Sequence, residues 1–123
     1  MKKHILIVDD EEHLADALAH NLQFEGFSTT VAYDGEEGLR LARTIQFDLV
    51  ILDIMMPDIK GYEVCKKIKE NPDTANTKII VLSAYLDEDK FKKMKEYGAD
   101  ACFSKPFPLP QLKEEVARLL EVR

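Results

Sequence analysis

Five short apolar segments recur along the chain, and they constrain its fold more than any other feature of the sequence. They are residues 5–8, 29–32, 49–52, 79–82 and 101–103. Each has the length of a strand, and several are apolar at consecutive rather than alternating positions. Continuous apolar runs of this kind are typical of strands that are covered on both faces, as in a parallel sheet flanked by helices.

The first two connecting segments have the apolar spacing of helices. The first stripe ends at Gly26, a residue suited to the left-handed position just past a helix. Its members are Leu14, Ala15, Leu18 and Leu22. The second helix begins with Asp34 and Glu37, which resemble a capping box. Its expected inward face consists of Leu39, Ala42 and Ile45.

Three further helical patterns complete the alternation. The third should end before the asparagine and proline at residues 71–72. The fourth is short, lysine-rich and stopped at Gly98, and the fifth is entered through Pro110. Their stripes are Tyr62, Cys65 and Ile68; Phe91 and Met94; and Leu109, Leu112, Val116, Leu119 and Leu120. Strand and helix thus alternate five times, which predicts an α/β fold with a doubly wound, five-stranded parallel sheet and five helices.

Length and composition fit one globular domain over residues 1–123, with no second domain expected. The net charge of −6 argues against a general nucleic-acid binder, because such proteins need a basic surface. No apolar stretch approaches the roughly 20 residues that span a bilayer, so we expect no membrane association and a cytoplasmic location. Cys65 and Cys102 match no metal-ligand spacing, and we expect small buried thiols rather than a disulfide.

Polar side chains follow four of the five predicted strands. Asp9 and Asp10 follow the first, Asp53 ends the third, Ser83 follows the fourth and Lys105 follows the fifth. Because the carboxyl ends of parallel strands meet at one edge of a sheet, all five should lie together. Three clustered carboxylates repel one another unless a cation or a proton is bound. Oxygen ligands without His or Cys favour Mg²⁺, with Mn²⁺ as a possible substitute.

The same residues allow simpler interpretations. Asp9 and Asp10 could stabilise the start of the first helix without a metal, Lys105 could be a solvated surface lysine, and Ser83 could bond to its own backbone.

The set of residues also suits a chemical role, because a carboxylate such as Asp53 can act as a nucleophile toward phosphorus. Transfer of a phosphoryl group needs mainly positioning and charge neutralisation, which a metal, a lysine and a hydroxyl can supply.

Four segments, ILIVDDE, DLVILDIMMPDIKG, IIVLSA and GADACFSKPF, resemble in order and spacing the receiver domain of two-component response regulators. The resemblance covers essentially the whole chain. It implies a flavodoxin-like fold with strand order 2-1-3-4-5 and Asp53 as the phosphoacceptor. It also implies that Asp10, Asp53 and the Met55 carbonyl bind Mg²⁺, with Asp9 assisting mainly through water.

The resemblance further implies that Ser83, Lys105 and the Ala84 backbone N–H hold the phosphoryl group, and that the Lys105–Pro106 bond is cis, as in many relatives. The donor would be a histidine kinase or a histidine phosphotransfer protein, and the output would be the surface of the fourth helix, fifth strand and fifth helix. Such a domain is no conventional enzyme; it catalyses its own Mg²⁺-dependent phosphorylation and slow autodephosphorylation. It can be a monomer or a phosphorylation-dependent dimer. One position departs from the family, because Cys102 replaces the usual switch aromatic.

Three other functions fit parts of the pattern. Cys102 is compatible with a pseudo-receiver that binds partners without being phosphorylated. A metal-dependent phosphohydrolase would also use an aspartyl phosphate, but it commonly needs an acid two residues after the nucleophile, where Met55 stands. A flavin- or nucleotide-binding module would need a Gly- or Ser-rich loop after the first strand, where this chain has acids at residues 9–12.

Overall fold

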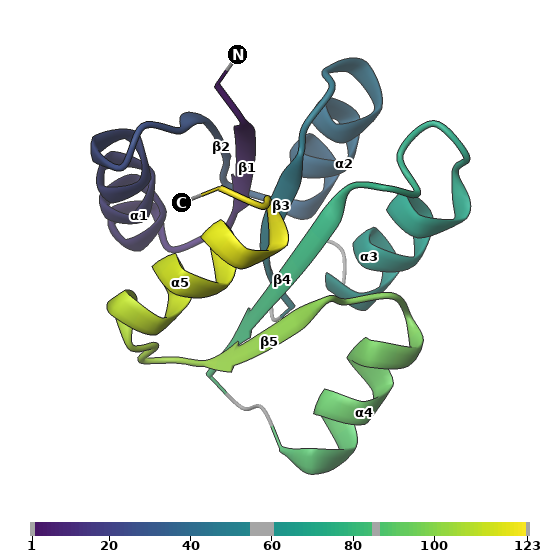
Figure 1. Ribbon diagram of the computed structural model, residues 1–123. Helices are drawn as coiled ribbons and strands as arrows, with labels where there is room; N and C mark the ends of the chain where they lie inside the picture. The colour runs from purple at the N-terminus through teal and green to yellow at the C-terminus, as the bar shows by residue number, and fades with distance from the viewer. Residues whose placement is uncertain (1, 55–60, 85–86, 123) are drawn as a thin grey trace.

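The computed structural model of the protein describes residues 2–54, 61–84 and 87–122. Strands and helices alternate in it as predicted (Figure 1). The strands are β1 (His4–Val8), β2 (Ser28–Ala32), β3 (Leu49–Asp53), β4 (Lys78–Ser83) and β5 (Ala101–Ser104). The helices are α1 (Glu12–Phe24), α2 (Gly35–Thr44), α3 (Gly61–Glu70), α4 (Glu88–Glu96) and α5 (Leu109–Leu119). All strand pairs are parallel and follow the order β2-β1-β3-β4-β5, which confirms the predicted doubly wound fold.

Helices cover both faces of the sheet, with α1 and α5 on one face and α2, α3 and α4 on the other (Figure 1). Successive strand residues point to opposite faces, so each strand contributes to two separate apolar cores. In β1, Leu6 and Val8 pack toward α2 and α3, whereas Ile5 and Ile7 pack toward α1 and α5. This two-sided burial explains the consecutive apolar residues of the central strands.

Local signals set the helix ends largely as expected. The Asp34 side chain accepts a 2.8 Å hydrogen bond from the Glu37 N–H and caps α2. Gly26 has φ +100° and Gly98 has φ +103°, the left-handed conformation that follows α1 and α4.

The expected inward position of Ile45 is wrong. Helix α2 ends at Thr44, so Ile45 takes an extended conformation that no longer follows the helical spacing and is 39% exposed.

The two cysteines carry free thiols. Cys65 is fully buried, as expected, whereas Cys102 is only half-buried because β5 is an edge strand. Cys102 packs against the core under α2, α3 and α4, while its neighbour Phe103 packs against the opposite core. Phe103 therefore lies on the wrong face of the sheet to replace a side chain at position 102.

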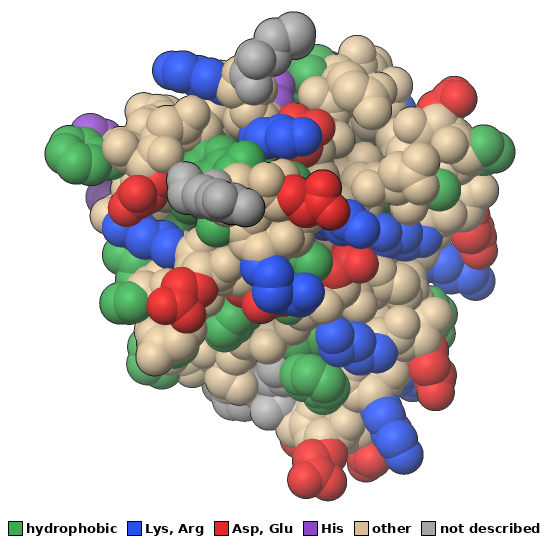
Figure 2. All heavy atoms as spheres, in the orientation of Figure 1, with side chains coloured by type: hydrophobic (Ala, Val, Ile, Leu, Met, Phe, Trp, Pro, Cys, Tyr) green, Lys and Arg blue, Asp and Glu red, His purple; other side chains and the backbone are tan. Residues whose placement is uncertain are grey.

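None of the helices in the described parts of the chain is long and apolar enough to cross a membrane. On the face shown in Figure 2, acidic and basic side chains are interspersed rather than gathered into a basic surface.

Candidate functional site

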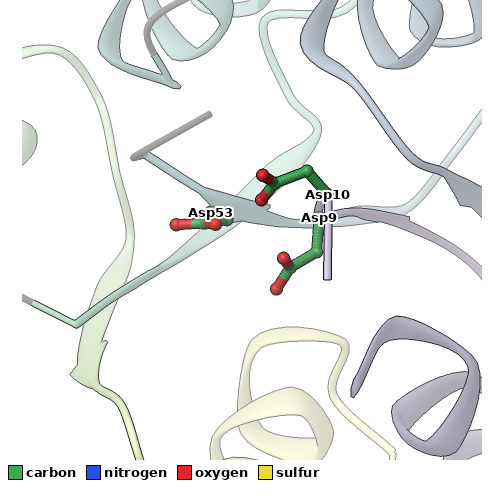
Figure 3. A group of neighbouring side chains, drawn as sticks. All are labelled: Asp9, Asp10 and Asp53. Carbon is green, nitrogen blue, oxygen red and sulfur yellow. The ribbon is translucent and has the colours of Figure 1, made fainter. Parts of the chain in front are cut away.

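Three carboxylates meet at the carboxyl ends of β1 and β3. Asp9 and Asp10 directly follow β1, and Asp53 is the last residue of β3. β1 and β3 are hydrogen-bonded neighbours in the sheet. The strand after β1 lies on one side of it and β3 lies on the other, so the direction of the strand order changes between β1 and β3. Sites in doubly wound sheets form at such a switch point. One oxygen from each carboxylate lies within 4.8 Å of the others. Figure 3 shows the Asp10 side chain turned toward Asp53 and the Asp9 side chain turned away from Asp10.

Asp9 is held on both sides of its carboxylate. Its backbone N–H donates to the Ala32 carbonyl at 3.1 Å, which extends the pairing of β1 with β2 by one residue. Its Oδ1 accepts from the Glu11 N–H at 2.9 Å, and its Oδ2 accepts from Lys105 Nζ at 2.9 Å. These contacts leave Asp9 only 2% exposed, whereas Asp10 is exposed. Asp10 is therefore the more accessible ligand for an ion.

Lys105 enters the site from the end of β5. Its backbone N–H donates to the Ser83 carbonyl at 2.9 Å, and the Lys105–Pro106 peptide bond is cis. Its side chain is only 9% exposed, so it is not a solvated surface lysine. The ammonium lies 3.4 Å from Asp53 Oδ2 in addition to its 2.9 Å contact with Asp9.

The charge of Lys105 is stabilised by these acids. Burial alone would lower the pKa of the Lys105 ammonium. The hydrogen bond to Asp9, the charge of Asp53 and a hydrogen bond to Glu11 outweigh burial and raise the pKa to about 12. The ammonium is therefore fully charged at neutral pH and offsets part of the repulsion among the carboxylates.

Ser83 and Ala84 lie at the same edge, at the end of β4. Ser83 is fully buried and is paired with Ser104 in the register of β4 and β5. Ala84 follows it and is exposed. Met55, for which we expected a carbonyl ligand, lies outside the described residues.

Glu11 is a member of the site for which the sequence predicted no role, although the segment ILIVDDE ends on it. Its Oε1 accepts from Lys105 Nζ at 3.1 Å, although its side chain is 62% exposed. The available signal was the acidic run at residues 9–12, which places a fourth carboxylate next to the predicted set. Glu11 is the N-cap residue of α1, and its side chain makes no cap hydrogen bond.

The donor set suits a hard divalent cation. All three clustered ligand groups are carboxylates, from Asp9, Asp10 and Asp53, and such oxygens are the ligands preferred by Mg²⁺ and Mn²⁺. Two are buried and one is exposed, so an ion could reach the group from solvent.

Comparison with known proteins identifies the fold family. The family model of the response regulator receiver domain matches residues 5–117. The chain belongs to this family. Receiver domains work in two-component signalling, in which a histidine kinase is the general partner, and they are generally not conventional enzymes. Receiver domains generally bind Mg²⁺ at an acidic pocket, and a cluster of aspartates is present in this chain.

Individual relatives agree with this assignment. The response regulator ArlR of Staphylococcus saprophyticus is 38% identical over 117 residues, which are 94% of this chain and 51% of ArlR. The chain spans about half the length of the curated relatives it matches.

Solved structures match over almost the whole chain. The signal receiver domain of a DNA-binding response regulator from Colwellia psychrerythraea has a TM-score of 0.91 and 32% identity, covering 98% of this chain and 99% of that one. A CheY-like receiver domain from Methanospirillum hungatei has a TM-score of 0.93 and 30% identity, covering 98% and 95%.

Proposed function

We propose that Asp53 accepts a phosphoryl group from a histidine kinase or a histidine phosphotransfer protein, and that the chain thereby acts as a phosphorylation switch. One observation carries the proposal. The Asp53 carboxylate ends a buried strand within 4.8 Å of two other carboxylates and 3.4 Å from a lysine ammonium. This arrangement combines a nucleophile with the charges that phosphoryl transfer requires.

In the proposed step, an Asp53 oxygen attacks the phosphorus of a phosphohistidine. An oxygen–phosphorus bond forms, the nitrogen–phosphorus bond breaks, and its electron pair leaves with the imidazole nitrogen. No proton has to leave Asp53, because a carboxylate is already ionised when it attacks. Lys105 approaches the same oxygen region from β5 and supplies positive charge there. Slow hydrolysis of the aspartyl phosphate by the domain itself would reset the switch.

Asp10 and Asp53 would hold Mg²⁺, with Mn²⁺ as a substitute. Asp9 would contact the ion through water, since its two oxygens already accept hydrogen bonds from Glu11 and Lys105. The Met55 carbonyl is proposed as a further ligand. The ion would neutralise charge on the transferring phosphoryl oxygens.

Two groups at the end of β4 would bind the new phosphoryl group. The Ser83 hydroxyl and the Ala84 N–H are proposed to donate to phosphoryl oxygens, because an aspartyl phosphate offers more charge and more acceptors than a carboxylate. Movement of this segment would change the surface of α4, β5 and α5. A hollow on that surface is lined by Asp87, Glu88, Asp89, Phe91, Lys92, Cys102 and Ser104. The position of Cys102 in this lining supports our proposal that it takes part in the switch.

Other properties remain proposals. Residues 1–123 would form one receiver domain, which would be a monomer or a phosphorylation-dependent dimer. The free thiols of Cys65 and Cys102 are compatible with a reducing, cytoplasmic compartment.

Labelling with radioactive acetyl phosphate and Mg²⁺ tests the proposal. The wild type should be labelled, the label should depend on Mg²⁺, and Asp53→Asn should abolish it. Asp73→Asn is the matched control, since Asp73 is an exposed aspartate in the segment that precedes β4, at the opposite edge of the sheet. Equal labelling of wild type and Asp53→Asn would refute the proposed role of Asp53. An unlabelled wild type would instead favour a protein-interaction module.

A further inference from the structure

The ammonium of Lys105 contacts three carboxylates at once. Its Nζ lies 2.9 Å from Asp9, 3.1 Å from Glu11 and 3.4 Å from Asp53. An ammonium has three N–H donors, so these contacts can occupy all of them. The contact with Asp53, the proposed phosphoacceptor, is the longest of the three.

Glu11 differs from the other two partners in its surroundings. Its side chain is 62% exposed, whereas the side chains of Asp9 and Asp53 are 3% and 5% exposed. Glu11 is also absent from the carboxylate group that could hold a metal, which comprises Asp9, Asp10 and Asp53 among the described residues. Glu11 is therefore no candidate ion ligand among the described residues, and its contact with Lys105 can be given up without removing a ligand from that group.

A phosphoryl group on Asp53 changes the competition for Lys105. It adds oxygens that accept charge-assisted hydrogen bonds. To bind one of these oxygens, the Lys105 ammonium has to give up one of its three contacts with carboxylates. Asp9 is fixed by its backbone pairing and by the Glu11 N–H, whereas the Glu11 side chain can turn into water.

We propose that Glu11 is a positioning residue that draws Lys105 toward the rim of the site before phosphorylation, and that this contact is released when Asp53 carries a phosphoryl group. The inference rests on the proposed function and adds a restraint on its lysine. Because Glu11 is exposed, the restraint is weak: exposed ion pairs correspond to factors of about two to five in an equilibrium. Glu11 thus slows phosphorylation without preventing it.

The first test uses the metal-free protein and needs no phosphorylation. In crystal structures of wild type and Glu11→Gln solved under the same conditions, the distance from Lys105 Nζ to Asp53 Oδ2, 3.4 Å here, should be shorter in the variant. Glu12→Gln is the matched control, because Glu12 is exposed, adjacent and equally charged, and Lys105 makes its ion pairs with other acids within the described residues. An unchanged Lys105 position in Glu11→Gln would overturn the inference.

The second test compares rates of phosphorylation by acetyl phosphate at saturating Mg²⁺. Both glutamine variants lose one negative charge, so any general attraction of the anionic donor should increase equally. Glu11→Gln should be about two- to fivefold faster than Glu12→Gln. Glu11→Asp keeps the charge but shortens the side chain, and it should also be faster than wild type.

The effect must act through Lys105. In a Lys105→Ala background, Glu11→Gln should no longer differ from Glu12→Gln, as a double-mutant cycle would show. Equal rates for the two glutamine variants with Lys105 present, or a persistent difference without it, would overturn the inference. If wild type labels normally while these comparisons fail, only the role of Glu11 is lost. If wild type is not labelled at all, the proposed function fails and the inference falls with it.

Discussion

The ammonium of Lys105 lies 2.9 Å from Asp9 Oδ2, although 96 positions separate the two residues in the chain. The contact joins the end of β5 to the end of β1, two strands that are not neighbours in the sheet. Both side chains are nearly buried, at 9% and 3% exposure. The acidic edge of the sheet is therefore partly neutralised from within the chain, before any ion is bound.

Lys105→Met should lower the free energy of unfolding of the metal-free protein by about 2 kcal/mol, because it leaves buried carboxylates without their charged hydrogen-bond donor. Mg²⁺ should restore part of this loss by supplying positive charge. Urea denaturation with and without Mg²⁺ measures both effects. Lys113→Met is the control, since Lys113 pairs with a half-exposed Glu25, and it should cost about 0.5 kcal/mol or less. A stability loss no larger than that of the control would contradict the account of Lys105.

Asp10→Asn should have opposite effects with and without metal. In the absence of metal it should raise stability by about 0.5–1 kcal/mol, because it removes one of three mutually repelling carboxylates. In the presence of Mg²⁺ the wild type should gain stability through ion binding, while the variant should gain little. Thermal denaturation over a Mg²⁺ titration gives the comparison. An Asp10→Asn variant that Mg²⁺ stabilises as strongly as wild type would exclude Asp10 as a ligand.

Gly61→Ala should disturb the site from the start of α3. A Cβ on Gly61 would lie 2.3 Å from the Ile54 Cα and 2.8 Å from the Asp53 carbonyl oxygen, so the backbone beside Asp53 would have to move. We expect a loss of about 3 kcal/mol and weaker Mg²⁺ binding. Gly26→Ala is the contrasting variant, since its Cβ has space and only the left-handed backbone is strained. It should cost about 1–2 kcal/mol and leave Mg²⁺ affinity unchanged. Equal Mg²⁺ affinities in the two variants would refute this role of Gly61.

Stability should fall at alkaline pH because of Cys65. Burial raises the pKa of its thiol from 9.0 to about 12. Between these values the unfolded chain loses a proton that the folded protein keeps, so stability is fully present below pH 9.0 and decreases as the pH rises toward 12. Lys105 adds a similar loss only above its ordinary value of 10.5.

The Cys65 effect can be measured between about pH 8 and pH 10, below the range in which Lys105 contributes. Burial also raises the pKa of the Cys102 thiol from 9.0, so the effect of Cys65 is the difference between wild type and Cys65→Ala, which both keep Cys102. Cys65→Ala should be less stable than wild type at neutral pH, yet its stability should fall less steeply over this interval. Parallel profiles of stability against pH for the two proteins would show that the Cys65 thiol does not cause the loss of stability at alkaline pH.

The architecture was predictable because each element has its own local signal. Continuous apolar runs indicated strands covered on both faces, and Gly26, Asp34 and Gly98 marked helix ends. Ile45 was misplaced because its apolar character continues the stripe of α2, while the helix itself stops at Thr44. Periodicity indicates which face a residue would take but not where a helix ends.

The grouping of the site followed from topology, since strand ends meet at one edge whatever the side chains are. Topology did not predict which carboxylates the Lys105 ammonium contacts. It depends on how far a flexible lysine reaches and on which acceptors lie near its end, so the sequence alone could not indicate that Glu11 joins Asp9 and Asp53.

The most direct measurement is the chemical position of the transferred phosphoryl group. After phosphorylation with acetyl phosphate and Mg²⁺, reduction with borohydride converts an aspartyl phosphate to homoserine, which peptide mass spectrometry locates. The account predicts homoserine at position 53 in the wild type and its absence when Mg²⁺ is chelated. Modification at Asp9 or Asp10 instead, or modification at position 53 that is independent of Mg²⁺, would contradict it.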